Sequence, residues 1–317
     1  MYNPLVTIGV LTYNDERFII KTLESIKSQT YDNIELIISD DCSSDKTLEL
    51  CRSWVEKNAH FFKRVLLLSS EKNNGVTNNC NRVEKTASGE WTKLIGGDDL
   101  LLDRCIEKFV EYVSENKTAK IIQCRLLLIN QDDDVIGNRM KGPNPFFHHE
   151  STTASFQHEI LLRTDPVDAL GLFKNKQTME FLDYYDTDFP MQEDTPFSMK
   201  ATSMDIKIYW LDDALVKRRM RPGTLSGISD KYLFVNNSIV RININKKYFE
   251  PYLKGTELYL SRYNDSLTRF IFNTPFLNRK CFFSIVLLRF LRFPVILIRK
   301  RKLHSIYKRI RKQYGLT

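Results

Sequence analysis

Residues 6–47 read VTIGVLTYNDERFIIKTLESIKSQTYDNIELIISDDCSSDKT, two strand-like runs separated by a helix-like segment. The runs at 5–12 and 34–39 are almost continuously apolar and rich in β-branched residues, which is typical of strands buried on both faces. The intervening segment 15–29 begins with Asp15, a good N-cap, and repeats apolar residues at helical spacing. This order predicts two parallel strands joined by a crossover helix.

The same alternation continues to about residue 130, where strands and helices follow one another in turn. We expect further strands at 64–69, 91–95 and 119–129, and helices at 45–58, 75–87 and 103–115. This order predicts an α/β fold with a doubly wound, mostly parallel sheet. Beyond residue 130 we expect a solvated hairpin tip at 132–134, helices at 166–173 and 192–203, and a strand at 206–211.

Charge is distributed unevenly along the 317 residues, whose formal net charge is +8. Residues 266–317 hold 13 Lys/Arg and no Asp or Glu, which leaves the other 265 residues with a net charge of −5. A strongly basic tail on a mildly acidic body indicates an anionic partner for the tail, either a membrane surface or a nucleic acid.

The apolar segment 281–298 is not expected to span a membrane, because Arg289 and Arg292 lie in its middle and Pro294 interrupts it. An interfacial amphipathic segment fits better, and a helix packed on the body is the alternative. Nucleic acid is disfavoured because the basic residues alternate with Ile, Leu and Phe and no nucleic-acid-binding motif appears.

The six cysteines are scattered, with no CxxC pair, and the N-terminal run lacks the basic flank of a signal peptide. We therefore expect reduced thiols and a cytoplasmic protein.

Acidic and amide residues follow three of the predicted strands, at 12–15, 40–45 and 98–99. The carboxyl ends of parallel strands meet at one edge of a sheet, where α/β folds bind their ligands. The sequence has neither GxGxxG nor GxxxxGK[ST], which disfavours a dinucleotide cofactor and a Walker loop. A group of carboxylates suits a divalent metal bridging to a diphosphate.

These residues resemble the opening of an inverting family 2 glycosyltransferase with the GT-A fold. Such proteins begin with a strand, then Tyr-Asn, a helix ending near Gln-Thr, and a strand ending in Asp-Asp-x-Ser-x-Asp. The resemblance covers about residues 4–228 and continues through Asn74-Gly75, Asn81, ASGEW (87–91), Asp98-Asp99, Gln192-Glu193-Asp194 and VKRRMRPGTLS (216–226). The sequence resembles in particular bacterial O-antigen and capsule glycosyltransferases.

The resemblance implies a UDP-sugar donor. Its binding residues would be Asp41 at the nucleobase, Asp40 supporting it, Tyr13 lining the pocket, Asp98 facing the ribose or sugar, and Arg219 and Arg221 closing over the diphosphate.

The resemblance also implies a divalent metal, Mn²⁺ or Mg²⁺, bound by Asp99 with Asp98 beside it. Asp194 would be the general base and Glu193 would orient the acceptor, although Asp194 is also a plausible plain helix N-cap. The family's usual DxDD is Gly96-Gly97-Asp98-Asp99 here, so the metal would rest on fewer carboxylates. Arg221 stands where the family often has His.

On this reading residues 1–230 form a GT-A catalytic domain, and 231–317 form a basic, membrane-associating helical appendage. Within the catalytic domain, 1–130 would bind the nucleotide-sugar and 131–230 the acceptor. The implied reaction is β-linkage formation on an undecaprenyl-diphosphate-linked saccharide, at the inner face of the bacterial plasma membrane, in O-antigen or capsule synthesis. The alternative is a non-enzymatic membrane- or nucleic-acid-binding protein acting through the basic tail.

Overall fold

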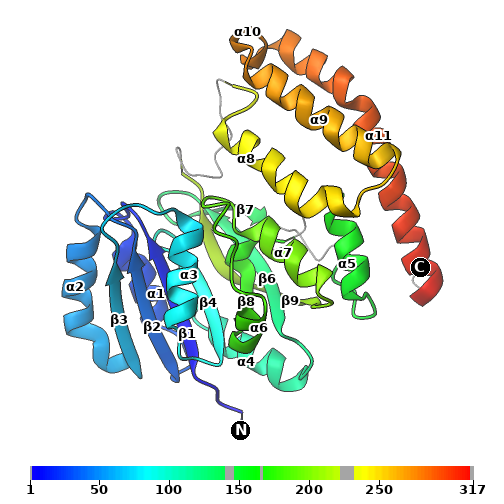
Figure 1. The fold of residues 1–317 in the computed structure, drawn as a ribbon. Helices are drawn as coiled ribbons and strands as arrows, with labels where there is room; N and C mark the ends of the chain where they lie inside the picture. The colour runs from blue at the N-terminus through cyan, green and yellow to red at the C-terminus, as the bar shows by residue number, and fades with distance from the viewer. Residues whose placement is uncertain (1, 140–145, 165–166, 222–231, 315–317) are drawn as a thin grey trace. The chain divides into compact units, whose positions relative to one another are not determined.

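The computed structural model describes residues 2–139, 146–164, 167–221 and 232–314 (Figure 1). The chain divides into two compact units. The first comprises Met1–Gln157 and Pro166–Arg221, and the second comprises His158–Asp165 and Pro222–Thr317. The predicted boundary near residue 230 falls outside the described residues and stays a prediction.

One mixed sheet organises the first unit, in the order β3-β2-β1-β4-β8-β6-β9-β5, with β7 paired to β6. Its strands are β1 (Val6–Thr12), β2 (Ile34–Asp40), β3 (Arg64–Ser69), β4 (Trp91–Gly96), β5 (Leu100–Leu101), β6 (Ile121–Ile129), β7 (Val135–Arg139), β8 (Leu172–Asn175) and β9 (Ile208–Arg219). The strands β3, β2, β1 and β4 are mutually parallel, and β6 is parallel to β9. The remaining pairings are antiparallel.

Helices cover both faces of the sheet around β1 and β2, and these two strands are therefore buried along almost their whole length. The helices are α1 (Ile19–Lys27), α2 (Thr47–Asn58), α3 (Val76–Thr86), α4 (Cys105–Glu115), α6 (Lys176–Phe181) and α7 (Asp194–Ser203). Helix α5 (Ala154–Leu161) has residues 154–157 in the first unit and 158–161 in the second. Side chains of α1, α2 and α4 share one core with Val6, Ile8 and Val10 of β1. On the other face, a Cβ at Gly9 would lie 2.3 Å from Val83 of α3, so glycine allows α3 its close approach.

The predicted α/β fold is confirmed, and the strands and helices expected before residue 130 are all present. The helix expected at 166–173 is wrong. Within its described part, the short turn Ala169–Gly171 is followed by β8, whose Phe173 stacks on Trp91 at 5.0 Å and on Phe109 at 4.7 Å between ring centroids. Pairing of β8 between β4 and β6 has overridden the local helical pattern.

The second unit is helical, as expected. Its elements are α8 (Asn236–Ile244), a π-helical turn (Asn245–Phe249), a 3-10 turn (Glu250–Tyr252), α9 (Thr256–Phe272), α10 (Pro275–Asn278) and α11 (Phe282–Tyr314). A small core contains Phe234, Leu267 and Ile271. Within the described ranges, every helix is too short or too polar to cross a bilayer.

A buried ion pair joins α3 to β8 in the first unit. Lys174 Nζ lies 2.6 Å from Glu84 Oε1, each side chain is 1 % exposed, and Lys174 Nζ also donates to Tyr185 Oη at 2.7 Å. Lys174→Met would leave Glu84 buried without its cation, so we expect a loss of about 3–5 kcal/mol of unfolding free energy in urea titrations. The double variant Lys174→Met/Glu84→Gln should lose less. Equal stability of the single variant and the wild type would contradict this.

Candidate active site

The carboxyl ends of β1, β2 and β4 lie at one edge of the sheet. Thr12 pairs with Asp40 in register, the Asp41 amide donates to the Thr12 carbonyl at 2.9 Å, and the Gly97 amide donates to the Leu11 carbonyl at 2.8 Å. Strand β9 ends at the same edge, because the amide of Arg219 donates to Asp99 Oδ1 at 2.8 Å. The structure therefore brings together residues from four strands that are far apart in the sequence.

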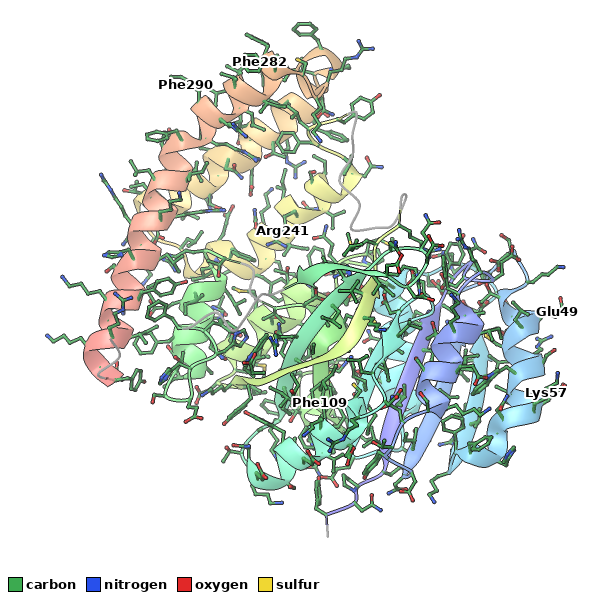
Figure 2. The ribbon with its side chains drawn as sticks, turned by 180° about the vertical axis from the view of Figure 1, so that it is seen from behind. Glu49, Lys57, Phe109, Arg241, Phe282 and Phe290 are labelled. Carbon is green, nitrogen blue, oxygen red and sulfur yellow. The ribbon has the colours of Figure 1, made fainter. Side chains whose placement is uncertain are left out.

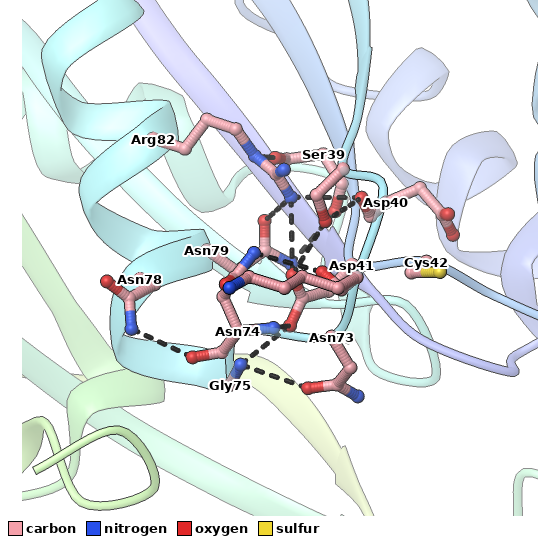
Figure 3. Close-up of polar contacts among 12 residues, drawn as sticks. Ser39, Asp40, Asp41, Cys42, Asn73, Asn74, Gly75, Asn78, Asn79 and Arg82 are labelled. Atoms are coloured by element: carbon pink, nitrogen blue, oxygen red, sulfur yellow. Dashed lines mark hydrogen bonds and ion pairs between the residues drawn. The ribbon is translucent and has the colours of Figure 1, made fainter.

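Asp41 holds the loop between β3 and α3 (Figure 3). Its Oδ2 accepts from the amides of Asn74 at 3.1 Å and Gly75 at 2.8 Å, and its Oδ1 accepts from Ser70 Oγ at 3.0 Å. Gly75 has a φ of 84°, and a Cβ there would lie 2.6 Å from the carbonyl oxygen of Pro190. Only glycine suits this position, where the loop meets the segment that leads to Glu193.

Arg82 of α3 holds the end of β2 through hydrogen bonds, and the sequence analysis missed it. Its Nε donates to Ser39 Oγ at 2.7 Å, and its Nη2 donates to the Asp40 carbonyl at 2.9 Å and to Asn79 Oδ1 at 2.8 Å (Figure 3). Its guanidinium also lies 3.7 Å from Asp41 Oδ1. It thus places a positive charge near the carboxylates of Asp40 and Asp41.

The loops after β1 and β2 are joined to each other. Asp40 Oδ2 accepts from the Ser43 amide at 2.9 Å, and Ser43 Oγ accepts from the Asn14 amide at 2.9 Å. The ring of Tyr13 is left exposed at the surface of this edge.

A side chain at Gly96 or Gly97, at the end of β4, would require a carboxylate nearby to shift. A Cβ at Gly96 would lie 2.8 Å from Asp99 Oδ2, and one at Gly97 would lie 2.6 Å from Asp15 Oδ2. Thr22 Oγ1 of α1 donates to the carbonyls of Gly97 at 2.9 Å and Asp99 at 2.8 Å. The two glycines let Asp98 and Asp99 follow the strand directly.

Negative charge is concentrated here. Burial and the neighbouring Asp98 raise the pKa of Asp15 to about 6, and the same two causes raise the pKa of Asp99 well above its ordinary value. Arg221 compensates part of this charge, since its Nη2 lies 2.7 Å from Asp15 Oδ1 and its Nε lies 2.9 Å from Asp98 Oδ2.

The side chain of Arg219 contacts the hairpin between β6 and β7. Its buried guanidinium donates to the carbonyls of Asp98 and Asn130, both at 2.7 Å, and pairs with Asp133 Oδ1 at 2.5 Å. Lys21 Nζ lies 2.5 Å from the other oxygen of Asp133. The hairpin expected at 132–134 is confirmed, but its tip is not simply solvated, because these two cations tie it to β9 and α1. The predicted contact of Arg219 with a diphosphate stays a prediction.

The sequence analysis also missed the ion pair between Asp168 and Arg218. Arg218 Nη1 donates to Asp168 Oδ2 at 2.8 Å, and the Asp168 side chain also accepts from the Leu170 amide at 3.2 Å, which caps the turn before β8. The charges of both residues act on Asp99 and on Glu193. The pair is therefore electrostatically linked to both groups of predicted site residues.

Glu193 and Asp194 open α7. Asp194 is the first helical residue and its Oδ1 accepts from the Thr195 amide at 2.6 Å, while Glu193 is at the N-cap without a side-chain capping bond. The preceding segment is fixed by α3, because Thr77 donates through its amide to the Pro190 carbonyl at 3.1 Å and through Oγ1 to the Phe189 carbonyl at 2.6 Å.

The donor set at Asp98 and Asp99 fits a divalent cation of the Mg²⁺ or Mn²⁺ type. Both residues offer hard carboxylate oxygens, and a cation would stabilise the ionised form of Asp99, whose pKa is raised by burial and by the neighbouring Asp98. Across the described residues, no three His, Cys, Asp or Glu side chains are grouped to hold a metal. Any cation bound here would need further oxygen ligands from water or from a diphosphate.

Burial and the Asp194 carboxylate raise the pKa of Glu193 from 4.5 to about 7. Between these values the folded chain keeps a proton that the unfolded chain has lost, so stability falls as pH rises through this window. Glu193→Gln should therefore have a higher Tm than the wild type at about pH 8.5 and a similar Tm at about pH 4. A Tm equal to or below that of the wild type at the higher pH would contradict the raised pKa.

Comparison with known proteins agrees with this arrangement. The profile described as Glycosyl transferase family 2 matches residues 7–166. An uncharacterized glycosyltransferase of Haemophilus influenzae is 26 % identical over 230 residues, which cover 71 % of this chain and 68 % of that protein. Putative glycosyltransferase EpsE of Bacillus subtilis is 30 % identical over 128 residues, which cover 40 % of this chain and less than half (45 %) of EpsE.

The crystal structure of S. aureus TarS residues 1–349 in complex with UDP-GlcNAc superimposes with a TM-score of 0.58 at 18 % identity, covering 98 % of this chain and 91 % of that one. This likeness shows the fold and confirms the GT-A expectation. Because the family profile covers half of the chain, and the curated relatives carry the glycosyltransferase name, the chain belongs to Glycosyl transferase family 2.

Proposed function

We propose that this glycosyltransferase moves a sugar from a UDP-sugar to an acceptor hydroxyl in a single inverting displacement. The observation that carries the proposal is the arrangement around Gly75. Its amide is held by Asp41, in the predicted nucleotide pocket, while its Cα packs against Pro190, three residues before Glu193. A donor pocket and a candidate base are thus adjacent in one rigid framework.

The donor end of the site has the chemistry for uracil. Asp41 Oδ1 accepts from Ser70 and keeps capacity for one more donor, such as the imide N–H of the base. Asp40 supports the pocket by fixing Ser43, and the exposed ring of Tyr13 offers a face for stacking. The UDP-GlcNAc complex of the similarly folded TarS agrees with a donor of this class.

The leaving diphosphate would lie against Arg221 and the carboxylates after β4. Arg221 already spans Asp15 and Asp98, and its planar guanidinium can bind two phosphate oxygens at once. A divalent cation held by Asp98 and Asp99 would supply further neutralisation of the leaving group. Asp98 would also face the donor ribose or sugar, and Arg219 would fix the backbone from which Arg221 reaches the site.

The acceptor hydroxyl would lose its proton to Asp194. Burial and the Asp194 carboxylate raise the pKa of Glu193 to about 7, which favours a proton on Glu193 and supports Asp194 as the base of the pair. Glu193 would orient the acceptor through its carboxyl group. Direct attack by the hydroxyl needs no covalent enzyme intermediate and inverts the anomeric centre, so an α-linked donor gives a β-linkage.

The acceptor that we propose is a saccharide on undecaprenyl diphosphate, in bacterial O-antigen or capsule synthesis. The basic second unit supports it, because 13 Lys/Arg without an acidic residue in 266–317 favour an anionic lipid surface, here the inner face of the plasma membrane. Membership of a glycosyltransferase family argues against a non-enzymatic binding protein.

The test is release of UDP from a panel of UDP-sugars in the presence of membrane extract. Asp194→Asn keeps the size of the side chain but cannot accept a proton, so turnover should fall by about 100-fold or more while UDP affinity is retained. The matched control is Asp32→Asn, an exposed carboxylate in the loop before β2, which should behave as the wild type. Turnover near the wild-type value in Asp194→Asn would remove this residue from the mechanism.

A further inference from the structure

One face of α11 carries three phenylalanines and a valine that are open to solvent along the first half of the helix. Phe282 is 84 % exposed, Val286 47 %, Phe290 77 % and Phe293 60 %. Their spacing of four, four and three residues places them on one side of the helix. Figure 2 shows Phe282 and Phe290 projecting outward from α11. We call these four residues the aromatic stripe.

The same side of the helix is basic along its second half. Seven residues after Phe293 comes Lys300, followed at helical spacing by Lys308 and Arg311, and all three are exposed. We call them the basic stripe. Arg289 is also exposed near the aromatic stripe, where its long side chain can reach a polar surface. One continuous helix face thus changes from aromatic to cationic.

The aromatic stripe is not the face by which α11 packs on its own unit. The buried residues of α11 are Ser284, Val295, Ile306 and Ile310. On that side Arg292 Nη2 donates to Thr268 Oγ1 of α9 at 2.8 Å, and its guanidinium lies 4.9 Å from the Phe234 ring centroid. Arg292 is therefore part of the packing within the unit and is not available at the exposed face.

We propose that α11 lies flat on an anionic lipid surface, with the aromatic stripe inserted at the acyl-chain boundary and the basic stripe on the headgroup phosphates. This arrangement rests on the membrane association proposed above. It adds that one defined face of α11 binds the lipid and that the attachment has two separable parts, the aromatic stripe and the basic stripe. Aromatic side chains favour the bilayer interface, and cations favour anionic headgroups. A second copy of this chain is a poorer occupant, because pairing two basic stripes would bring like charges together.

Vesicle co-sedimentation separates the two parts, and it needs no sugar donor, so its result is independent of the proposed reaction. Phe282→Ser/Phe290→Ser/Phe293→Ser changes exposed residues only and should lower binding to phosphatidylglycerol-containing vesicles at 1 M NaCl by tenfold or more. Lys300→Gln/Lys308→Gln/Arg311→Gln should lose the preference for these vesicles over neutral phosphatidylcholine at low salt. Phe181→Ser, which changes a 64 % exposed phenylalanine of α6, is the matched control and should bind as the wild type.

Insertion can be observed directly at Cys281, which is exposed and adjoins Phe282. With Cys42 replaced by serine, an environment-sensitive dye on Cys281 should shift its emission to the blue on phosphatidylglycerol-containing vesicles. Two outcomes would overturn the proposal. One is unchanged dye emission together with unchanged vesicle binding of the phenylalanine variant. The other is conversion of a wild-type dimer to a monomer by that variant without loss of vesicle binding, which would make the aromatic stripe an interface between copies.

Discussion

The balance between buried carboxylates and the arginines at the end of β9 is the interaction on which the site depends. Parallel strands deliver Asp15, Asp98 and Asp99 to one edge, where burial and mutual repulsion raise the pKa values of Asp15 and Asp99. Arg221 forms ion pairs with Asp15 and Asp98, and Arg218 forms an ion pair with Asp168. The balance is incomplete, since burial and Asp98 hold the pKa of Asp99 well above its ordinary value, and a residual excess of carboxylates favours a bound cation.

The framework that fixes this edge also connects its two chemical ends. Helix α3 begins at the loop that Asp41 holds, and the same helix binds the segment 189–190 through Thr77 and 185 through Asn81. Displacement of that loop would therefore move residues both at the predicted nucleotide pocket and in the segment that leads to Glu193. This physical link explains how a donor subsite and a base separated by about 150 residues in sequence are kept in register.

The fold before residue 130 was predictable because each strand and helix there has a clear period and sits next to a turn signal. The residues Asp41, Asp98, Asp99 and Asp194 could be proposed from motif order, and their chemical roles stay predictions. The roles of Arg82 and of the Asp168–Arg218 pair could not be found, because each makes its contacts with residues about 40 or 50 positions away. Arg82 and Asp168 lie in no motif, and the motif that contains Arg218 does not indicate its partner. Strand β8 was mistaken for a helix because its conformation comes from pairing with β4 and β6. The inward direction of Arg292 likewise depends on α9.

Calorimetric titration of UDP and of uridine tests the charge balance most directly. The account predicts that the wild type binds UDP at least about tenfold more tightly than uridine in the presence of Mn²⁺, because the diphosphate meets Arg221 and the carboxylate-bound cation. In Arg221→Gln the advantage of UDP over uridine should shrink, with uridine affinity unchanged. Equal affinities for UDP and uridine in the wild type, or an undiminished advantage in Arg221→Gln, would contradict the account.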